Sequence, residues 1–220
     1  MNQAFPINEE SLSLLRSTLP EIENEKRAAH SVSVEKECRY FAKQTALSEE
    51  DTLMLQAAAL LHDCTHLLSL DAHRALLLSG GYSDADADAF LKYPKTVHQV
   101  TAPIYIRAKF PAFAEEEILS AVGCHTTGKP GMTLLDILLC LADYTEETRP
   151  YEECRAMRKR LHEALERANG IDERKALFSE AMLSYLSATI RHIAAGHKGD
   201  LDPMTLAARE DLIGKCKKEL

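Results

Sequence analysis

The side chains best suited to chemistry in this sequence are histidines and aspartates that lie mostly in or directly beside apolar segments with helical periodicity. They are His30, His62, Asp63, His98, His125 and Asp143. A carboxylate in an apolar helix costs free energy unless it is paired or bound to a cation. Imidazole nitrogens with carboxylate oxygens and no thiolate suit iron, manganese or zinc better than copper. The set therefore predicts a metal centre, whereas each histidine taken alone would more often be structural.

Three stretches carry a resemblance to a known family, namely ALLHD at 59–63, CHTTGKPGMTLLD at 124–136 and LADYTEETRP at 141–150. The order His, His-Asp, His, His, Asp is similar to the HD superfamily of metal-dependent phosphohydrolases, in the version with two extra histidines that builds a two-metal centre. H-T-T-G and L-A-D-Y resemble, more narrowly, the YqeK family of symmetrical diadenosine tetraphosphate hydrolases. The resemblance covers about residues 20–150 and implies an all-α HD-domain helical bundle.

The resemblance also implies roles for individual residues. The six residues would hold two metal ions, with iron favoured over manganese or zinc, and Asp63 would bridge them. The metals would supply a hydroxide that attacks an interior phosphorus of diadenosine tetraphosphate and releases two ADP molecules. Asp63 and His66 are the candidate catalytic residues. The candidate substrate-binding residues are side chains near the ligands that suit phosphate, namely Arg27, Thr126, Thr127, Lys129 and Arg149.

Two positions depart from the usual pattern of that family. The family usually has lysine three residues after the aspartate of the HD pair, whereas this chain has His66. An imidazole thus replaces a fixed ammonium unless it is protonated, which affects how phosphate charge is handled. The family commonly reads ADYIEPNR where this chain reads ADYTEETR, with Glu146 and Arg149 kept. Neither departure touches a candidate metal ligand.

Two other functions fit the same residues. The metal centre could act on a different nucleotide, either a nucleoside triphosphate or guanosine 3′-diphosphate 5′-diphosphate. The chain could instead be a non-catalytic nucleotide-binding module. His66 motivates that interpretation, and the complete set of candidate ligands opposes it.

Helices must position these residues, because nearly every segment has a 3.6-residue period and strand-like alternation is hard to find. Asn8, Ser48, Ser83 and Thr133 are suited to N-cap positions. Pro20 is expected to end the first helix and to begin the second. LLDILLCLADY, apolar on almost every side, is predicted to be the central helix. The first helix is predicted from Asn8 to Pro20, the second from there to about 45, and the third from 48 through LMLQAAALL. The fourth is predicted to end at Gly80, the fifth to begin at Ser83, and the sixth to follow Pro94 and to include Pro103. The remaining helices are predicted over 115–124, 133–144, 151–168, 172–195 and 203–217.

Two regions are expected. Residues 1–150 form the HD phosphohydrolase core, and residues 151–220 form a C-terminal helical extension that packs on it, with a homodimer face as the alternative use of its apolar stripes. Of the remaining histidines, His73 and His162 are among those expected at the surface.

Composition and charge restrict the partners. The 220 residues are 45% hydrophobic and 27% charged, which is typical of a globular protein. The formal charge of −8 argues against nucleic acid and anionic membrane partners, although bound metals would make one pocket positive enough for a small nucleotide. The longest apolar run, ILLCLA at 137–142, is too short to span a bilayer. Six cysteines without a C-x-x-C pair suit a reducing compartment, so a cytoplasmic location without membrane contact is predicted.

Overall fold

The computed structural model describes residues 7–196 and 200–216, and all regular structure within these ranges is helical. The predicted all-α class is therefore confirmed. The elements in chain order are α1 (Glu9–Ile22), α2 (Glu25–Thr45), α3 (Glu49–Leu61), α4 (Leu70–Ser79), α5 (Asp84–Leu91), α6 (Val97–Lys109), a 3₁₀ turn (Pro111–Phe113), α7 (Glu116–Val122), α8 (Leu134–Thr145), α9 (Glu152–Arg167), α10 (Ile171–Ala194) and α11 (Pro203–Cys216).

Local sequence explains where the helices begin. The side chains of Asn8, Ser48, Ser83 and Thr133 each accept a hydrogen bond from a backbone N–H in the first turn of α1, α3, α5 and α8, as predicted. The prediction for Pro20 was wrong, because α1 continues past it to Ile22 and Asn24 caps α2. The last turn of α1 is held by fully buried Leu19, whose carbonyl accepts the N–H of Glu23, and this outweighs the hydrogen bond that proline cannot donate.

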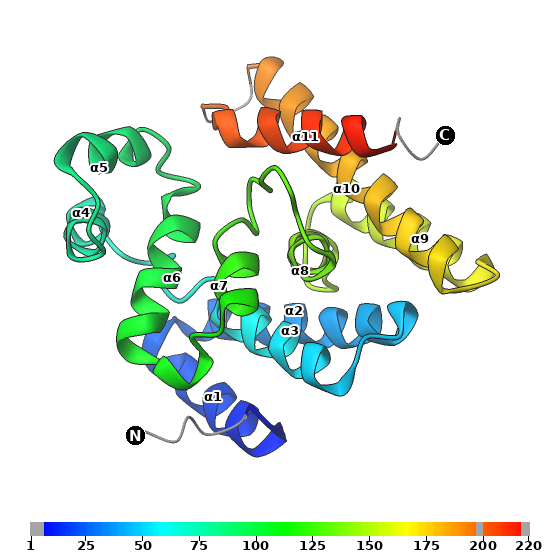
Figure 1. Ribbon diagram of the computed structural model, residues 1–220, viewed down its shortest axis with the longest axis horizontal. Helices are drawn as coiled ribbons and strands as arrows, with labels where there is room; N and C mark the ends of the chain where they lie inside the picture. Colours follow the sequence, from blue (N-terminus) through cyan, green and yellow to red (C-terminus); the bar gives the residue numbers. More distant parts are fainter. Residues whose placement is uncertain (1–6, 197–199, 217–220) are drawn as a thin grey trace.

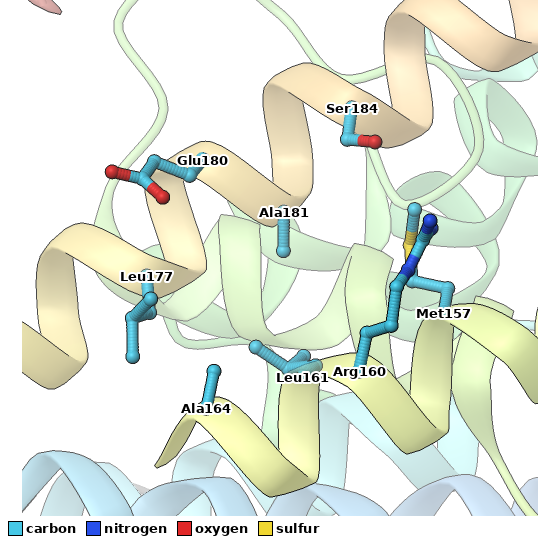
Figure 2. Close-up of a pocket in the computed structure, with 8 residues that line it drawn as sticks. All are labelled: Met157, Arg160, Leu161, Ala164, Leu177, Glu180, Ala181 and Ser184. Carbon is cyan, nitrogen blue, oxygen red and sulfur yellow. The ribbon is translucent and has the colours of Figure 1, made fainter. Parts of the chain in front are cut away.

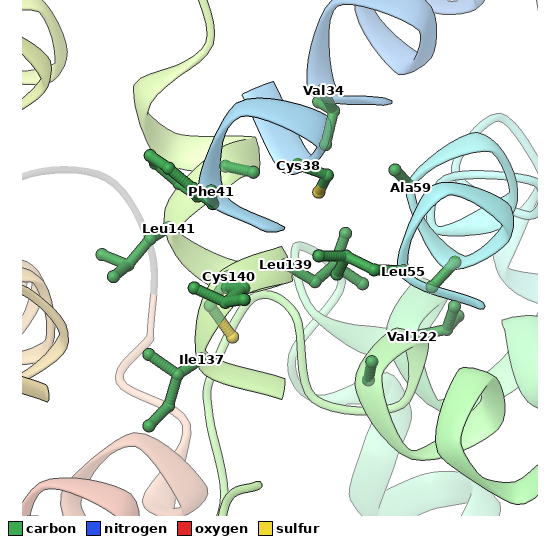
Figure 3. Packing of buried hydrophobic residues seen from close by; sticks show 14 of the residues in the cluster. Val34, Cys38, Phe41, Leu55, Ala59, Val122, Ile137, Leu139, Cys140 and Leu141 are labelled. Atoms are coloured by element: carbon green, nitrogen blue, oxygen red, sulfur yellow. The ribbon is translucent and has the colours of Figure 1, made fainter. Parts of the chain in front are cut away.

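Helix α8 lies at the centre of the bundle, as its apolar sequence predicts. In Figure 1 it is seen nearly end-on, between α2 and α3 on one side and α10 and α11 on the other. It contacts α2, α3, α7, α9 and α10. Figure 3 shows its side chains packed among those of α2, α3 and α7; the labelled residues are Ile137, Leu139, Cys140 and Leu141 of α8 with Val34, Cys38, Phe41, Leu55, Ala59 and Val122. A polar side chain on α8 is therefore held by neighbours on several sides.

The last three helices share this core. Phe178 of α10 is fully buried, and its ring meets that of Phe41 of α2 edge-on at 4.8 Å between centroids. Between α9 and α10 the structure has a small pocket lined largely by apolar side chains, among them Leu161, Leu177 and Ala181 (Figure 2). Helices α4 and α5 pack on α6 around a separate, smaller apolar cluster. Within the described ranges, no helix has the length and hydropathy needed to cross a bilayer.

Candidate metal centre

The six residues singled out above come together from five parts of the chain. His30 lies on α2, His62 and Asp63 at the end of α3, His98 on α6, His125 in the turn after α7, and Asp143 on α8. Their donor atoms form three overlapping groups with all members within 4.8 Å of one another, namely His30, His62 and Asp63; His62, His125 and Asp143; and Asp63, His98 and His125. Five of the six residues are buried, and Asp143 is partly exposed.

Asp63 occupies the middle of this arrangement. Its Oδ2 lies 3.3 Å from Nε2 of His62 and 3.8 Å from Nε2 of His30. Its Oδ1 lies 3.3 Å from Nε2 of His98 and 3.8 Å from Nε2 of His125. One carboxylate therefore faces two pairs of imidazoles with its two oxygens, which is the position that a residue shared by two cations requires.

The outer nitrogen of three rings is already engaged. Nδ1 of His62 lies 2.7 Å from the Ala59 carbonyl oxygen, and Nδ1 of His125 lies 2.8 Å from the Val122 carbonyl oxygen. Because a carbonyl only accepts, both Nδ1 atoms carry the proton and donate. Nδ1 of His30 lies 3.1 Å from a carboxylate oxygen of Glu146 and donates in the same way. Metal-binding histidines commonly have such an outer acceptor, which fixes the tautomer and directs the other nitrogen inward.

The inner nitrogens consequently face oxygens that also only accept. Nε2 of His30 is 2.9 Å from Oδ1 of Asp143. Nε2 of His62 is buried 3.6 Å from the same oxygen, and it is among the buried side-chain atoms of the described chain that have no hydrogen-bond partner. Opposed lone pairs repel unless a proton or a cation lies between them. The donor set and its geometry therefore fit metal ions that prefer nitrogen and oxygen ligands.

The ionisation of the side chains divides the cluster into two halves. Burial lowers the pKa of His30 and of His62, but the carboxylates that face them have the larger combined effect, so both values are raised. In the other half, burial together with the neighbouring histidines lowers the pKa of His98, and burial and His62 lower that of His125 to about 4. Burial alone would raise the pKa of Asp63, yet the surrounding histidines hold it well below its usual range. His98 and His125 are thus neutral, as metal ligands must be.

Two arginines predicted to contact substrate lie on the carboxylates of the cluster. Nη1 of Arg27 is 2.6 Å from Oδ2 of Asp63. The guanidinium of Arg149 bonds to the side chain of Asp143, and its Nε lies 2.7 Å from the backbone carbonyl of that residue. Each arginine side chain is 25% exposed, so both border the cluster and reach solvent.

His66 lies beside Arg27, with 3.3 Å between its Nε2 and Nη2 of the guanidinium. Because the guanidinium can only donate, Nε2 accepts and the ring proton sits on Nδ1. Burial lowers the pKa of His66, and the positive charge of Arg27 adds to that effect against the attraction of Asp63. His66 is therefore a neutral imidazole at pH 7, unlike the ammonium that a lysine would place there.

The remaining predicted substrate contacts differ in their surroundings. Oγ1 of Thr126 lies 3.4 Å from Nε2 of His98 and so adjoins the cluster. Oγ1 of Thr127 donates to the carbonyl of Gly128 at 2.8 Å. Nζ of Lys129 lies 3.2 Å from Oδ2 of Asp136, a fully buried carboxylate that also caps the start of α8. Thr127 therefore bonds within the loop and Lys129 bonds to the start of α8, rather than to the six clustered residues.

The expectation of a surface position was wrong for His73, and His162 is only partly exposed. His73 is buried, and its Nδ1 lies 2.8 Å from Oγ1 of Thr101 on α6. His162 is part-buried, with Nε2 2.7 Å from a carboxylate oxygen of Glu37 and its ring stacked on Tyr40. Both lie on amphipathic helices, where the partner across the interface decides burial and cannot be read from the helix alone.

Sequence reasoning also missed residues next to the cluster. Glu146 holds Nδ1 of His30, and two further polar side chains, Gln99 and Tyr185, bond to the backbone that follows His125. Gln99 directly follows His98, and Glu146 lies three residues after Asp143 in the segment already quoted, so position pointed to both. Tyr185 gave no signal, because it lies 60 residues from His125 (185 − 125) in the C-terminal region.

Comparison with known proteins gives two curated relatives, both named symmetrical bis(5′-nucleosyl)-tetraphosphatase. The protein of Halalkalibacterium halodurans is 28% identical over 127 residues, which cover 58% of this chain and 64% of the relative. The protein of Bacillus subtilis is 38% identical over 60 residues, which cover 26% of this chain and 32% of the relative. The chain thus spans less than two thirds of the length of each.

Among solved structures, a crystal structure described as a predicted HD superfamily hydrolase involved in NAD metabolism, from Clostridium acetobutylicum, is similar in fold. It has a TM-score of 0.74 and 26% identity, with 92% of this chain and 97% of the other covered. Residues 27–148 match the family model described as HD domain, a range that is more than half of the chain and contains all six clustered residues. The chain belongs to the HD domain family.

Proposed function

We propose that this protein hydrolyses diadenosine tetraphosphate symmetrically, to two ADP molecules, at a two-metal centre formed by the six clustered residues. The observation that carries the proposal is the convergence of four Nε2 atoms on the carboxylates of Asp63 and Asp143, with opposed acceptors that a cation would reconcile. The shared name of the two curated relatives supports the choice of substrate.

Asp63 and the bound metals would have distinct roles in the reaction. Asp63 would be shared between two metals, since each of its oxygens faces a different pair of histidines. Bound metals would activate water near neutral pH and neutralise charge on phosphate oxygens. Iron is the favoured metal on the resemblance to the family, and manganese or zinc would suit the same nitrogen and oxygen donors.

Substrate phosphates would meet the partly exposed arginines first. Arg27 and Arg149 border the cluster on different carboxylates, those of Asp63 and Asp143, and a guanidinium can bind phosphate through two parallel hydrogen bonds. The hydroxyl of Thr126 adjoins His98 and can donate to a phosphate oxygen. Thr127 and Lys129 remain proposed substrate contacts that would have to exchange their present partners.

His66 is the second proposed catalytic residue, beside Asp63. In its neutral form, with Nε2 accepting from Arg27, it adds no positive charge where the family places lysine. We propose that it orients Arg27, while the charge that stabilises the phosphates comes from the arginines and the metals. A proton on His66 would be repelled by Arg27, so this role favours the neutral ring.

A different nucleotide is the second candidate substrate. The structural relative from Clostridium acetobutylicum is described as involved in NAD metabolism. This description supports testing nucleotides other than diadenosine tetraphosphate as substrates. A nucleoside triphosphate and guanosine 3′-diphosphate 5′-diphosphate fit the same phosphate chemistry. We propose a cytoplasmic setting with a small nucleotide as partner, and the C-terminal helices as the face of any homodimer.

The test is a product analysis with protein purified without chelator and supplied with iron or manganese. Diadenosine tetraphosphate, a nucleoside triphosphate and guanosine 3′-diphosphate 5′-diphosphate are incubated side by side, and the products are separated. ADP as the sole product from the first, with slower turnover of the others, is expected. Release of ATP plus AMP would exclude symmetrical cleavage, and tight binding without any product over hours would leave the non-catalytic interpretation.

A further inference from the structure

The turn that carries His125 is held at one peptide unit by side chains from two distant helices. Oε1 of Gln99, on α6, accepts the backbone N–H groups of both Thr126 and Thr127, at 3.0 and 3.2 Å. The phenol of Tyr185, on α10, donates to the backbone carbonyl of Thr126 at 2.7 Å. In a trans peptide the C=O of one residue and the N–H of the next point in opposite directions. The two side chains therefore hold the 126–127 peptide from opposite edges.

Both side chains are buried, and their polar groups are engaged in these contacts. Gln99 is buried, and its Nε2 donates to Oγ1 of Thr127 at 2.8 Å, so both ends of its amide are engaged. Two backbone donors at one end identify that end as the oxygen. Tyr185 is also buried, and its ring packs at 4.8 Å from that of Tyr144, the residue after Asp143. Both side chains are therefore part of the buried structure around the turn, and neither is a surface residue.

The hydrogen bonds connect directly to the geometry of the cluster. Gln99 follows His98 on the same helix, while Thr126 follows His125, and the Nε2 atoms of the two histidines are 3.0 Å apart. The bond from Gln99 to the 126–127 peptide thus fixes the turn of His125 to the helix of His98. These two histidines and Asp63 form one of the three candidate metal groups, so the distances between their donor atoms depend on how the turn of His125 is held.

We propose that Gln99 and Tyr185 are positioning residues that fix the place of His125 relative to His98. Through Tyr185, helix α10 of the C-terminal region thus supports the metal centre. The proposal rests on the metal binding of the proposed function but not on its substrate. Partners that act behind a ligand typically change metal affinity by about 10- to 100-fold. The loss is expected at the position shared by Asp63, His98 and His125 and not at the one that includes His30.

The test combines a measurement on metal-free protein with a metal titration. Gln99→Met removes the acceptor, Gln99→Glu keeps an oxygen that can accept both N–H groups, and Tyr185→Phe removes only the hydroxyl. Amide hydrogen exchange at Thr126 and Thr127 is followed in chelator. Faster exchange is expected in Gln99→Met, with protection restored in Gln99→Glu. Manganese titration of each variant then gives the affinity of each of the two positions.

The expected result is an affinity loss of about 10-fold or more at one of two positions in Gln99→Met and in Tyr185→Phe. The matched control is Thr45→Val, which removes a buried hydroxyl that donates to the Phe41 carbonyl at the end of α2. Thr45→Val is expected to lower stability without changing either affinity. The proposal would be overturned if Gln99→Met and Tyr185→Phe kept the amide exchange and the metal affinities of the wild type. It would also be overturned if Thr45→Val lost as much affinity as they do. If the wild-type chain binds no metal, the proposed function fails, and the exchange data still decide whether Gln99 holds the turn.

Discussion

At the scale of single residues, identical side chains differ in state because their neighbours differ. The carboxylates around His30 and His62 raise the pKa of both, whereas burial and the neighbouring histidines lower the pKa of His98 and His125 despite the nearby Asp63. Asp63 lies between these pairs, with one oxygen directed toward each. Removing it should therefore affect both halves of the cluster at once.

Asp63→Ala is expected to abolish binding of both metal ions and to reduce turnover by more than about 100-fold, beyond the effect of residues that act behind a ligand. The matched variant is His66→Ala, three residues away, which removes a neutral ring outside the three metal groups. It should keep two metals per chain and lose turnover only. Metal analysis of protein purified without chelator measures both. Normal metal content and rate in Asp63→Ala would contradict the two-metal interpretation.

His73 predicts a pH dependence of stability. Burial lowers its pKa below the usual 6.5, and His66 lowers it further when that ring is protonated, so the unfolded chain binds this proton more tightly than the folded one. The stability that the neutral ring contributes is full above about pH 6.5 and is lost as the pH falls below that value. His73→Gln should therefore lose less stability than the wild type between pH 7 and pH 5, as measured by urea denaturation in chelator. Equal losses in both would show that His73 is not the titrating group.

At the scale of elements, the loop between α7 and α8 depends on two glycines with positive φ. Gly128 has φ of +65°, and a Cβ there would lie 3.1 Å from Cβ of Ala208 on α11, with sulfur and methyl groups of Met132 and Met182 at 3.2 and 3.3 Å. Gly131 has φ of +73°, and a Cβ there would meet nothing within 4 Å. Its backbone N–H donates to Asp211 of α11 at 2.9 Å. Both positions have a left-handed backbone that disfavours other residues, but only at Gly128 would an added side chain meet other atoms within 4 Å.

Gly128→Ala and Gly131→Ala separate these two effects. Each should cost roughly 1–2 kcal/mol for the left-handed backbone. Gly128→Ala should cost about 1–3 kcal/mol more, because the added methyl presses on the Ala208 side of α11, which cannot rotate away. The free energy of unfolding from urea denaturation measures the difference. Equal costs would show that the loop and α11 are not in firm contact.

At the scale of the whole molecule, residues 151–220 share the core of residues 1–150. Phe178, Met182 and Leu186 of α10 belong to the same apolar cluster as Leu139 of α8 and Phe41 of α2. The predicted division at residue 150 therefore follows the extent of the family resemblance, and the apolar core crosses it. An extension that contributes to the central core is expected to unfold together with the rest.

Phe178→Ala should lower the free energy of unfolding of the whole chain by about 3–5 kcal/mol, the usual cost of removing a buried phenylalanine. Leu206→Ala on α11, where the side chain is 42% exposed, should cost less than about 0.5 kcal/mol. Near- and far-ultraviolet circular dichroism should report one coincident transition for each protein. Two separate unfolding transitions, of which Phe178→Ala shifts only one, would show that the two regions fold independently.

The helical class, most of the helix boundaries and the six residues of the candidate centre could be predicted from the sequence. Caps such as Ser48 and Thr133 and the apolar character of α8 act over a few residues, so they can be read without the fold. The resemblance to the HD superfamily likewise depends on short segments and their order. The extension of α1 past Pro20 shows where this local reading ends, because burial of Leu19 in the core decided it.

Only the tertiary structure decided which partners those residues have. The acceptors that fix the ring of His30, the contact of Arg27 with Asp63, the burial of His73 and the bond from Tyr185 to Thr126 all join residues far apart in the chain. Such contacts depend on how helices cross and which faces meet, and a single amphipathic pattern leaves both open. Residue types therefore fixed what chemistry the chain can do, while packing fixed where each proton and each positive charge lies.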